Sequence, residues 1–250
     1  MPERHGSLGD FIERKHRIER ERPLLAAEPR LVTIDGVDGA GKTTFSHTLA
    51  DRLGAKFGSD RISLVNVNNF IGGTQQERLG DLMRNETLSP RQIDGMFAAT
   101  VNRSYGEEVV PALDSGKIVV VDRSEIDLLR FAIEHGNEAD VERRLGYLRD
   151  GTLTHRRWAG NRILMRVPAE DAWGNLAERL YHSKYDPTSV EDVRRRIVAE
   201  QSAESQVLEL PRTGEVTVLP FENHRIEDQE SRRMWLREQA DLLIEKFRFV

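Results

Sequence analysis

The chain has 250 residues, 32% of them charged, and is long enough for one large α/β domain or two small ones. A net charge of −5 disfavours a general nucleic-acid-binding or anionic-membrane surface, although it permits a local basic cleft. Because there is no cysteine, disulfides and thiolate metal sites are excluded. The sequence has neither an apolar run of the roughly 18 residues that a membrane span needs nor the apolar core of a signal peptide. We therefore expect a cytoplasmic protein.

Residues 1–29 are heavily charged, with both signs mixed most densely between positions 11 and 22. Mixed charge of this kind suits an exposed helix with i,i+4 ion pairs, and Pro23 is expected to end it. We expect a charged helical N-terminal extension that packs loosely on the domain or on a partner. A basic DNA-binding arm is the alternative, but glutamates dilute its charge.

A P-loop spacing, Gly36-x-x-x-x-Gly41-Lys42-Thr43, is the strongest signal in the chain. An apolar run at 31–34 precedes it and predicts a buried strand, and residues 44–53 predict a helix with one apolar face. Glycines let backbone N–H groups surround phosphate oxygens, and the helix N-terminus adds partial positive charge. Lys42 is expected to reach the β- and γ-phosphates, and the Thr43 hydroxyl to hold Mg²⁺. The predicted donor-binding residues are Gly36, Gly39, Ala40, Gly41, Lys42, Thr43 and Thr44.

Strands and helices alternate along residues 30–250, which we expect to form one domain. Strands are predicted at 31–34, 61–67, 117–122, 163–167 and 215–219. Helices are predicted at 44–53, 77–84, 90–115 and 124–136, from 168, and at 190–208 and 227–247, and the polar residues 137–161 are predicted to be helix-like. Pro111 predicts a kink or break inside 90–115, and Gly116 predicts the end of that helix. The alternation predicts an α/β fold, a doubly wound parallel five-stranded sheet flanked by helices.

Three charged residues are expected at the carboxyl ends of the strands, where ligands bind in open α/β sheets. Asp122 ends the apolar run 117–122, and we predict that it lies beside Mg²⁺ with Thr43. A helix N-cap is its alternative role. Arg123 is predicted to grip a phosphate in bidentate fashion, the alternative being a surface salt bridge. Asp38 would repel a triphosphate, so it is expected to accept a hydrogen bond from a sugar hydroxyl or to orient the attacking group, unless it is an ordinary loop aspartate.

The polar segment 178–187 lies between two predicted helices and has the character of a mobile lid. Phosphoryl transfer needs cations on the transferred group and exclusion of water, and Arg179, His182 and Lys184 could serve. We expect a helical lid at about 179–195. Arg194–Arg196 could contribute, but a solvated helix face is the plainer interpretation. The histidines show no metal-ligand spacing, so the only metal predicted is Mg²⁺ that enters with the nucleotide.

Two blocks resemble the thymidylate kinase family. Residues 34–44 resemble its P-loop, including the internal aspartate, and residues 102–123, with Asn102-Arg103 and the Asp122-Arg123 strand tip, resemble its second motif. The resemblance covers roughly 30–245 and implies a three-layer P-loop kinase fold, ATP with Mg²⁺ as donor, a nucleoside monophosphate acceptor and often a homodimer. It implies that Asp38 lies near the acceptor sugar and that Arg103 and Arg123 lie near the acceptor nucleotide. From the residues alone, Arg103 could equally be a solvated helix arginine.

The acceptor side departs from the family pattern. The usual Arg-Glu-Pro before Gly-Gly-Thr is replaced by residues 69–71, Asn-Phe-Ile, which removes an acceptor-phosphate arginine. Four positions before Arg103, where the family has an aromatic residue, this chain has Ala99. The nearby Phe97 is the candidate for contact with the acceptor. Ser124 stands where an aromatic residue usually follows Asp-Arg, and the family's lid Arg-Gly pattern is absent. Donor binding is therefore expected to be intact and the thymidylate pocket rebuilt.

We expect ATP- and Mg²⁺-dependent phosphoryl transfer to dTMP or a related nucleoside monophosphate, and no nucleic-acid or membrane partner. A (deoxy)nucleoside kinase is one alternative, because Asp122-Arg-Ser also resembles an element of those enzymes. The missing acceptor-phosphate arginine favours the same alternative, because a nucleoside has no phosphate to hold. A nucleotide-binding regulatory protein without catalysis is the other, although Lys42, Thr43 and Asp122 argue against it. The residues predicted to act in catalysis are Lys42, Asp38 and Arg123; those predicted to bind the acceptor are Asp38, Arg103, Arg123 and Phe97; the lid cations are Arg179 and Lys184.

Overall fold

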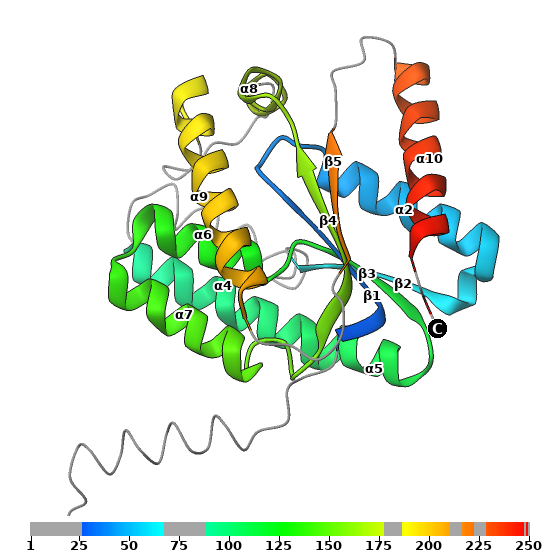
Figure 1. Cartoon of the computed structure of the whole chain (residues 1–250), viewed down its shortest axis with the longest axis horizontal. Helices are drawn as coiled ribbons and strands as arrows, with labels where there is room; N and C mark the ends of the chain where they lie inside the picture. The colour runs from blue at the N-terminus through cyan, green and yellow to red at the C-terminus, as the bar shows by residue number, and fades with distance from the viewer. Residues whose placement is uncertain are drawn as a thin grey trace, which may run out of the picture.

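A five-stranded parallel sheet forms the middle layer of the computed structural model, which describes residues 27–67, 89–177, 187–210, 217–222, 229–247 and 249 (Figure 1). The strand order is β2-β3-β1-β4-β5. The strands are β1 (Ala27–Gly36), β2 (Ile62–Asn66), β3 (Ile118–Asp122), β4 (Trp158–Arg166) and β5 (Thr217–Glu222). Each pair of neighbouring strands runs parallel. The doubly wound α/β architecture predicted from the sequence is confirmed.

Helices cover both faces of the sheet (Figure 1). They are α2 (Lys42–Phe57), α4 (Pro90–Ser104), α5 (Val110–Asp114), α6 (Glu125–His135), α7 (Glu138–Asp150), α8 (Ala169–Ala177), α9 (Val190–Leu208) and α10 (Gln229–Lys246). In Figure 1, α2 and α10 lie on one side of the sheet, whereas α4, α6, α7 and α9 lie on the other. Among the described residues, no helix combines the length and the apolar character needed to cross a bilayer.

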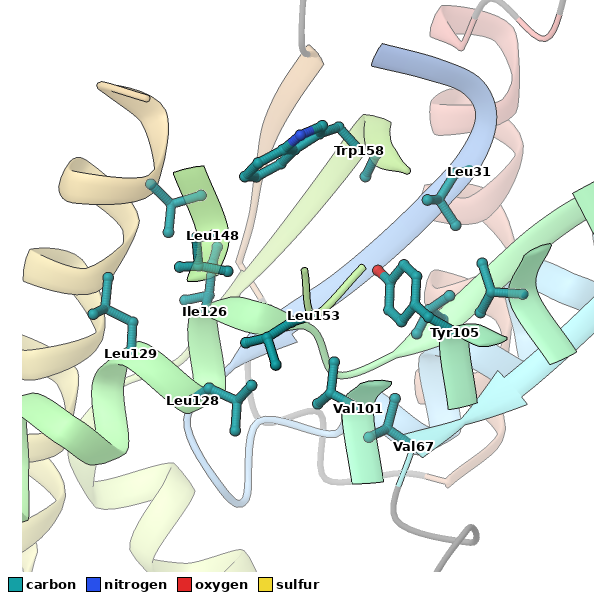
Figure 2. Packing of buried hydrophobic residues seen from close by; sticks show 14 of the residues in the cluster. Leu31, Val67, Val101, Tyr105, Ile126, Leu128, Leu129, Leu148, Leu153 and Trp158 are labelled. Carbon is teal, nitrogen blue, oxygen red and sulfur yellow. The ribbon is translucent and has the colours of Figure 1, made fainter. Parts of the chain in front are cut away.

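Side chains of the inner strands alternate between two hydrophobic clusters, one on each face of the sheet. Val119 and Val121 of β3 belong to the cluster that includes residues of α4, α6 and α9, whereas Ile118 and Val120 belong to the cluster that includes residues of α2 and α10. Figure 2 shows part of the first cluster, where Tyr105 packs near the sheet. Burial on both faces explains the continuous apolar run that predicted this strand.

The predicted break within residues 90–115 is confirmed. Helix α4 passes into a π-helical turn at Tyr105–Val109 before α5 begins. Pro111 has no N–H to donate and its ring clashes with the preceding turn, so the hydrogen-bond ladder is rearranged just before it. Gly116, with a φ of 85°, then ends α5, and its N–H donates to the carbonyl of Leu113 over 2.9 Å. This left-handed conformation is one that glycine adopts without steric penalty.

Two predicted boundaries are wrong. Residues 137–161 do not form one polar helical segment, because α7 ends where Gly151 adopts a left-handed φ of 71° and β4 begins at Trp158. Strand β1 begins at Ala27, so residues 27–29 belong to the sheet and not to a helical extension. The two differences have one cause, since the early part of β4 pairs with the early part of β1. The predicted helices at 77–84 and within residues 1–26 lie outside the described residues.

The close approach of β4 to β1 requires glycine at position 160. This predicts opposite effects on stability for two Gly→Ala substitutions. A Cβ at Gly160 would lie 2.7 Å from the carbonyl oxygen of Glu28 and 2.8 Å from Cα of Pro29, so Gly160→Ala must push the strands apart. We expect it to destabilise the protein by about 1–3 kcal/mol, as overpacking does. Gly146 in α7 has open space at its Cβ position, so Gly146→Ala should stabilise by roughly 0.5–1 kcal/mol. Thermal unfolding followed by circular dichroism measures both, and a shift of the same sign in the two variants would contradict the packing at Gly160.

Candidate active site

The loop between β1 and α2 is built around glycines that no other residue can replace without strain. Gly36, Gly39 and Gly41 have φ values of 144°, 88° and 87°. A Cβ at Gly36 would lie 2.5 Å from the carbonyl oxygen of Met165 in β4, and one at Gly39 would meet the carbonyl oxygen of Ala172 in α8. The loop therefore needs glycine both for its backbone conformation and for its close approach to β4 and α8. Its geometry fits the predicted phosphate-binding role.

Lys42 lies at the start of α2, and its amine turns back into the loop. Its Nζ donates to the carbonyl oxygens of Gly36 and Val37, the latter over 3.0 Å, and lies 3.8 Å from Oδ1 of Asp38. Only 5% of the side chain is exposed. The lysine charge is thus held at the loop by backbone oxygens and a carboxylate, which are groups that anionic phosphate oxygens can replace. Thr43 and Thr44 are exposed at the same helix N-terminus.

Asp122 and Thr43 come together as predicted. The Thr43 hydroxyl donates to Oδ2 of Asp122 over 2.6 Å, and Nδ2 of Asn66 donates to the same oxygen over 3.0 Å. Asp122 is buried, and its Oδ1 accepts no hydrogen bond from any described residue. The alternative role as a helix N-cap is wrong, because Ser124 caps α6 and accepts from the N–H of Ile126. A free carboxylate oxygen beside a threonine hydroxyl is a donor set that suits Mg²⁺.

Asp38 lies among cations that come from three parts of the chain. Arg123 donates to its Oδ1 over 2.7 Å, Arg196 donates to its Oδ2 over 3.0 Å, and Nη2 of Arg130 lies 4.0 Å from that oxygen. Burial alone would raise the pKa of Asp38, but Arg123, Lys42, Arg130 and Arg196 together hold that pKa well below its usual range. Asp38 is therefore a carboxylate at neutral pH. It can accept a hydrogen bond from a ligand hydroxyl.

The prediction that Arg194–Arg196 form a solvated helix face is right for Arg194 and Arg195 and wrong for Arg196. The side chains of Arg194 and Arg195 are 55% and 73% exposed, whereas that of Arg196 is 9% exposed. The signal that could have found Arg196 is periodicity, since the buried residues of α9 recur at helical spacing. These are Val193, Arg196, Ala199, Glu200, Ala203 and Val207.

Comparisons with known proteins agree with this geometry. The thymidylate kinase family model matches residues 34–144, which contain the loop and the Asp122-Arg123 strand tip. A thymidylate kinase of Exiguobacterium sibiricum is 38% identical over 99 residues, which are 37% of this chain and 43% of that enzyme. One from Cupriavidus taiwanensis is 28% identical over 163 residues, 64% of this chain and 76% of the relative. The chain thus spans less than half the length of the first relative and about three quarters of the second.

A crystal structure of thymidylate kinase from Ehrlichia chaffeensis has the same fold. It matches with a TM-score of 0.58 at 14% identity, over 86% of this chain and 97% of that one. Parts of the chain are therefore similar in sequence to thymidylate kinases, and its fold is that of a solved thymidylate kinase. The family model ends at residue 144, so Arg196 and the whole of β4 lie beyond the part that it matches.

Beneath the site, the protein buries a polar cluster that the sequence did not predict. Asp35 and Arg162 are 0% exposed. Ser124 donates to Oδ1 of Asp35 over 2.7 Å, and Nη1 of Arg162 lies 3.9 Å from Oδ2 of Asp35. Arg162 also donates to Glu125 at the start of α6. The cluster therefore joins the end of β1, the start of α6 and the middle of β4.

The remaining predicted residues lie in different places. On α4, Arg103 is 56% exposed and pairs with Glu107 over 3.0 Å. Phe97, also on α4, packs edge to face against Phe131, with 5.7 Å between the ring centroids. Their roles in acceptor binding stay predictions. The predicted lid residues Arg179 and Lys184, and the segment 69–71, lie outside the described residues.

Asp35 predicts a pH dependence of stability. Burial raises its pKa from 3.8 to about 7, despite the opposing charge of Arg162. Between these values the folded state holds a proton that the unfolded state has released, so the contribution of Asp35 is fully present below pH 3.8 and falls as pH rises to about 7. Asp35→Asn keeps an oxygen for Ser124 but cannot titrate. As pH rises across this window, the free energy of unfolding of Asp35→Asn should increase relative to that of the wild type, by at most about 1.4 kcal/mol per pH unit.

The measurement is urea unfolding of both proteins at several pH values from 4 to 8. At the acid end both carry a neutral side chain at position 35, so the difference should be smallest there. Parallel stability curves for the two proteins would show that Asp35 does not hold its proton in the folded state.

Proposed function

We propose that this protein transfers the γ-phosphoryl group of ATP to a nucleoside monophosphate, with dTMP the first acceptor to test. The observation that carries the proposal is the convergence, at one edge of the sheet, of Lys42 in the glycine loop, the Thr43–Asp122 pair and the Asp38–Arg123 pair. The first two suit the phosphates and metal of a donor, and the third suits an acceptor. The likeness to thymidylate kinases supports the same pairing of donor and acceptor.

On the donor side, the loop N–H groups and Lys42 bind the β- and γ-phosphates of ATP. Lys42 then exchanges its contacts with the carbonyl oxygens of Gly36 and Val37 for phosphate oxygens. Thr43 and Asp122 would hold Mg²⁺, since Asp122 has a buried oxygen that no described residue satisfies. When bound, the metal ion neutralises charge on the phosphates.

On the acceptor side, Arg123 binds the phosphate of the monophosphate and Asp38 accepts a hydrogen bond from its sugar. Asp38 is suited to this role because neighbouring cations keep its pKa low, so it is always an acceptor at neutral pH. Arg103 and Phe97 are proposed to contact the same nucleotide, and Arg179 and Lys184 to place cations on the transferred group. A homodimer is part of this proposal, as the resemblance implies.

One of the two observations that favoured a nucleoside kinase has another explanation. Ser124 is part of the Asp-Arg-Ser element that favoured that interpretation, but its hydroxyl caps α6 and donates to Asp35. These contacts explain a serine at this position without reference to the acceptor. Lys42, Thr43 and Asp122 favour a kinase over a regulatory protein without catalysis, because phosphoryl transfer needs a cation and a metal ion on the transferred phosphate.

An acceptor panel tests the function. ATP with Mg²⁺ is mixed with dTMP, other nucleoside monophosphates, the corresponding nucleosides or no acceptor, and ADP release is measured. Release should depend on a monophosphate, because Arg123 offers the phosphate a partner. Turnover only with nucleosides would favour the nucleoside kinase, and ATP binding without turnover on any acceptor would favour the regulatory protein.

Lys42→Ala tests the donor site. It should lower kcat by at least about 100-fold, the scale of removing one charge-stabilising donor from an active site. The matched control is Lys56→Ala, which removes an exposed lysine from the last turn of the same helix and should leave kcat unchanged. Activity in Lys42→Ala equal to that of the control would exclude the glycine loop as the donor site.

A further inference from the structure

Two arginines that the proposed function does not use converge on Asp38. Arg130 comes from α6 and Arg196 from α9, and their side chains are 7% and 9% exposed. Arg196 donates to Oδ2 of Asp38 over 3.0 Å, and Arg130 lies 4.0 Å from the same oxygen. Arginine is seldom buried without a partner of opposite charge. Here both guanidinium groups are directed at the loop that is proposed to bind the substrates.

Glu134 joins the two arginines on their other side. Nη1 of Arg130 donates to Oε2 of Glu134 over 2.7 Å, and Nε of Arg196 lies 3.5 Å from Oε1 of the same carboxylate. Arg123 is held in a similar way between Asp38 and Asp127, at 2.7 Å and 3.0 Å. Each arginine is thus oriented by Asp127, Glu134 or both on α6, and each also lies near Asp38. Preorganised cations of this kind bind an oxyanion without first paying for side-chain ordering.

Asp38 is the carboxylate that these arginines share. The cations Lys42, Arg123, Arg130 and Arg196 lie among carboxylates that include Asp38, Asp122, Asp127 and Glu134. Three of the four cations, Arg123, Arg130 and Arg196, lie within 4.0 Å of the Asp38 carboxylate. An anion that took the place of this carboxylate would therefore meet three guanidinium groups at once.

We propose that Arg130 and Arg196, together with Arg123, form the binding site for the phosphate group of the acceptor. In the absence of acceptor, Asp38 occupies the place of that phosphate and holds the arginines. A phosphate monoester takes over these contacts and leaves Asp38 to accept from the sugar hydroxyl. Guanidinium groups pair with phosphate through two parallel hydrogen bonds, which makes them selective for this group. Arg196 is then a residue that sets the preference for a monophosphate over a nucleoside. This inference rests on the proposed function.

The variant Arg196→Gln tests it, with Arg195→Gln as the matched control on the same helix. Arg195 is 73% exposed and pairs with Asp192 of its own helix turn, so its loss should leave kinetics unchanged. Arg196→Gln should lower kcat/KM for the monophosphate at least about tenfold, the effect of losing one charged hydrogen bond, while the KM for ATP stays within twofold. The ratio of kcat/KM for monophosphate over nucleoside should fall by the same factor. Equal kinetics in the two variants would overturn the inference and leave the proposed function standing.

A binding measurement separates the site from the reaction. With the donor site saturated by a non-hydrolysable ATP analogue and Mg²⁺, inorganic phosphate is titrated and the rise in melting temperature is recorded. The wild type and Arg195→Gln should be stabilised, and Arg196→Gln should not. If phosphate stabilises the wild type in this way but no acceptor is turned over, the anion site stands and the proposed function fails. If phosphate stabilises none of them, or all of them equally, the inference fails.

Arg196→Lys guards against a variant that simply misfolds. It keeps the charge opposite Asp38 and Glu134 but lacks the planar fork, so the fold should persist and the response to phosphate should be intermediate. Circular dichroism without ligand checks the fold of each variant. A lysine variant with full response to phosphate would show that only charge is needed and would contradict the bidentate site.

Discussion

Charge compensation at Asp38 is the interaction on which the rest of the site depends. Its carboxylate accepts from Arg123, which follows β3, and from Arg196 on α9, while Lys42 at the start of α2 lies 3.8 Å away. A buried carboxylate without such partners is strongly unfavourable. The loop after β1, the tip of β3 and α9 must therefore come together for Asp38 to be buried, and the same requirement brings the cations of the candidate site to one place.

A second polar layer supports the first from below. Asp35 is the last residue but one of β1 and Arg162 lies within β4, and both are linked to the start of α6, through Ser124 and Glu125. An aromatic side chain at position 124 lacks the hydroxyl on Cβ with which Ser124 both caps α6 and donates to Asp35. The departure from the family's aromatic residue at this position is therefore explained by packing beneath the site. It carries no information about the acceptor, which is why the serine alone does not indicate a nucleoside kinase.

The parts of the site that the sequence predicted are those set by local rules. The spacing of the glycines with Lys42 and Thr43 needs only one loop and one helix start, and Asp122 follows from the rule that parallel strands end at one edge of the sheet. No local sequence pattern predicts the contact between Arg196 and Asp38, because the two residues lie 158 positions apart in the chain. Only the packing of α9 against the loop reveals it. Arg162 was missed for a related reason, since a polar residue in a strand gives no sign of whether its face is covered.

The fold was likewise predictable where local sequence patterns determine it and not where contacts between distant residues do. Alternating strands and helices predicted the parallel sheet, and Pro111 predicted the break that became a π-helical turn. The start of β4 at Trp158 was not predicted, because the residues around it are polar and only their pairing with β1 makes them a strand. Hydrophobic periodicity indicates which face of an element is buried, whereas the start of β4 depends on pairing with a strand that is distant in the chain.

Without ligands, the site is neutralised by its own groups. Lys42 is satisfied by the carbonyl oxygens of Gly36 and Val37, and the arginines by Asp38 and the carboxylates of α6. A ligand must therefore offer each cation an oxygen at least as good as the one it gives up. The hydroxyl groups of a nucleoside would compete with the arginines for Asp38 and give the arginines no oxyanion in return. Under the proposed function, a monophosphate supplies that oxyanion and frees Asp38 in the same step, so the internal pairing is an argument for a phosphorylated acceptor.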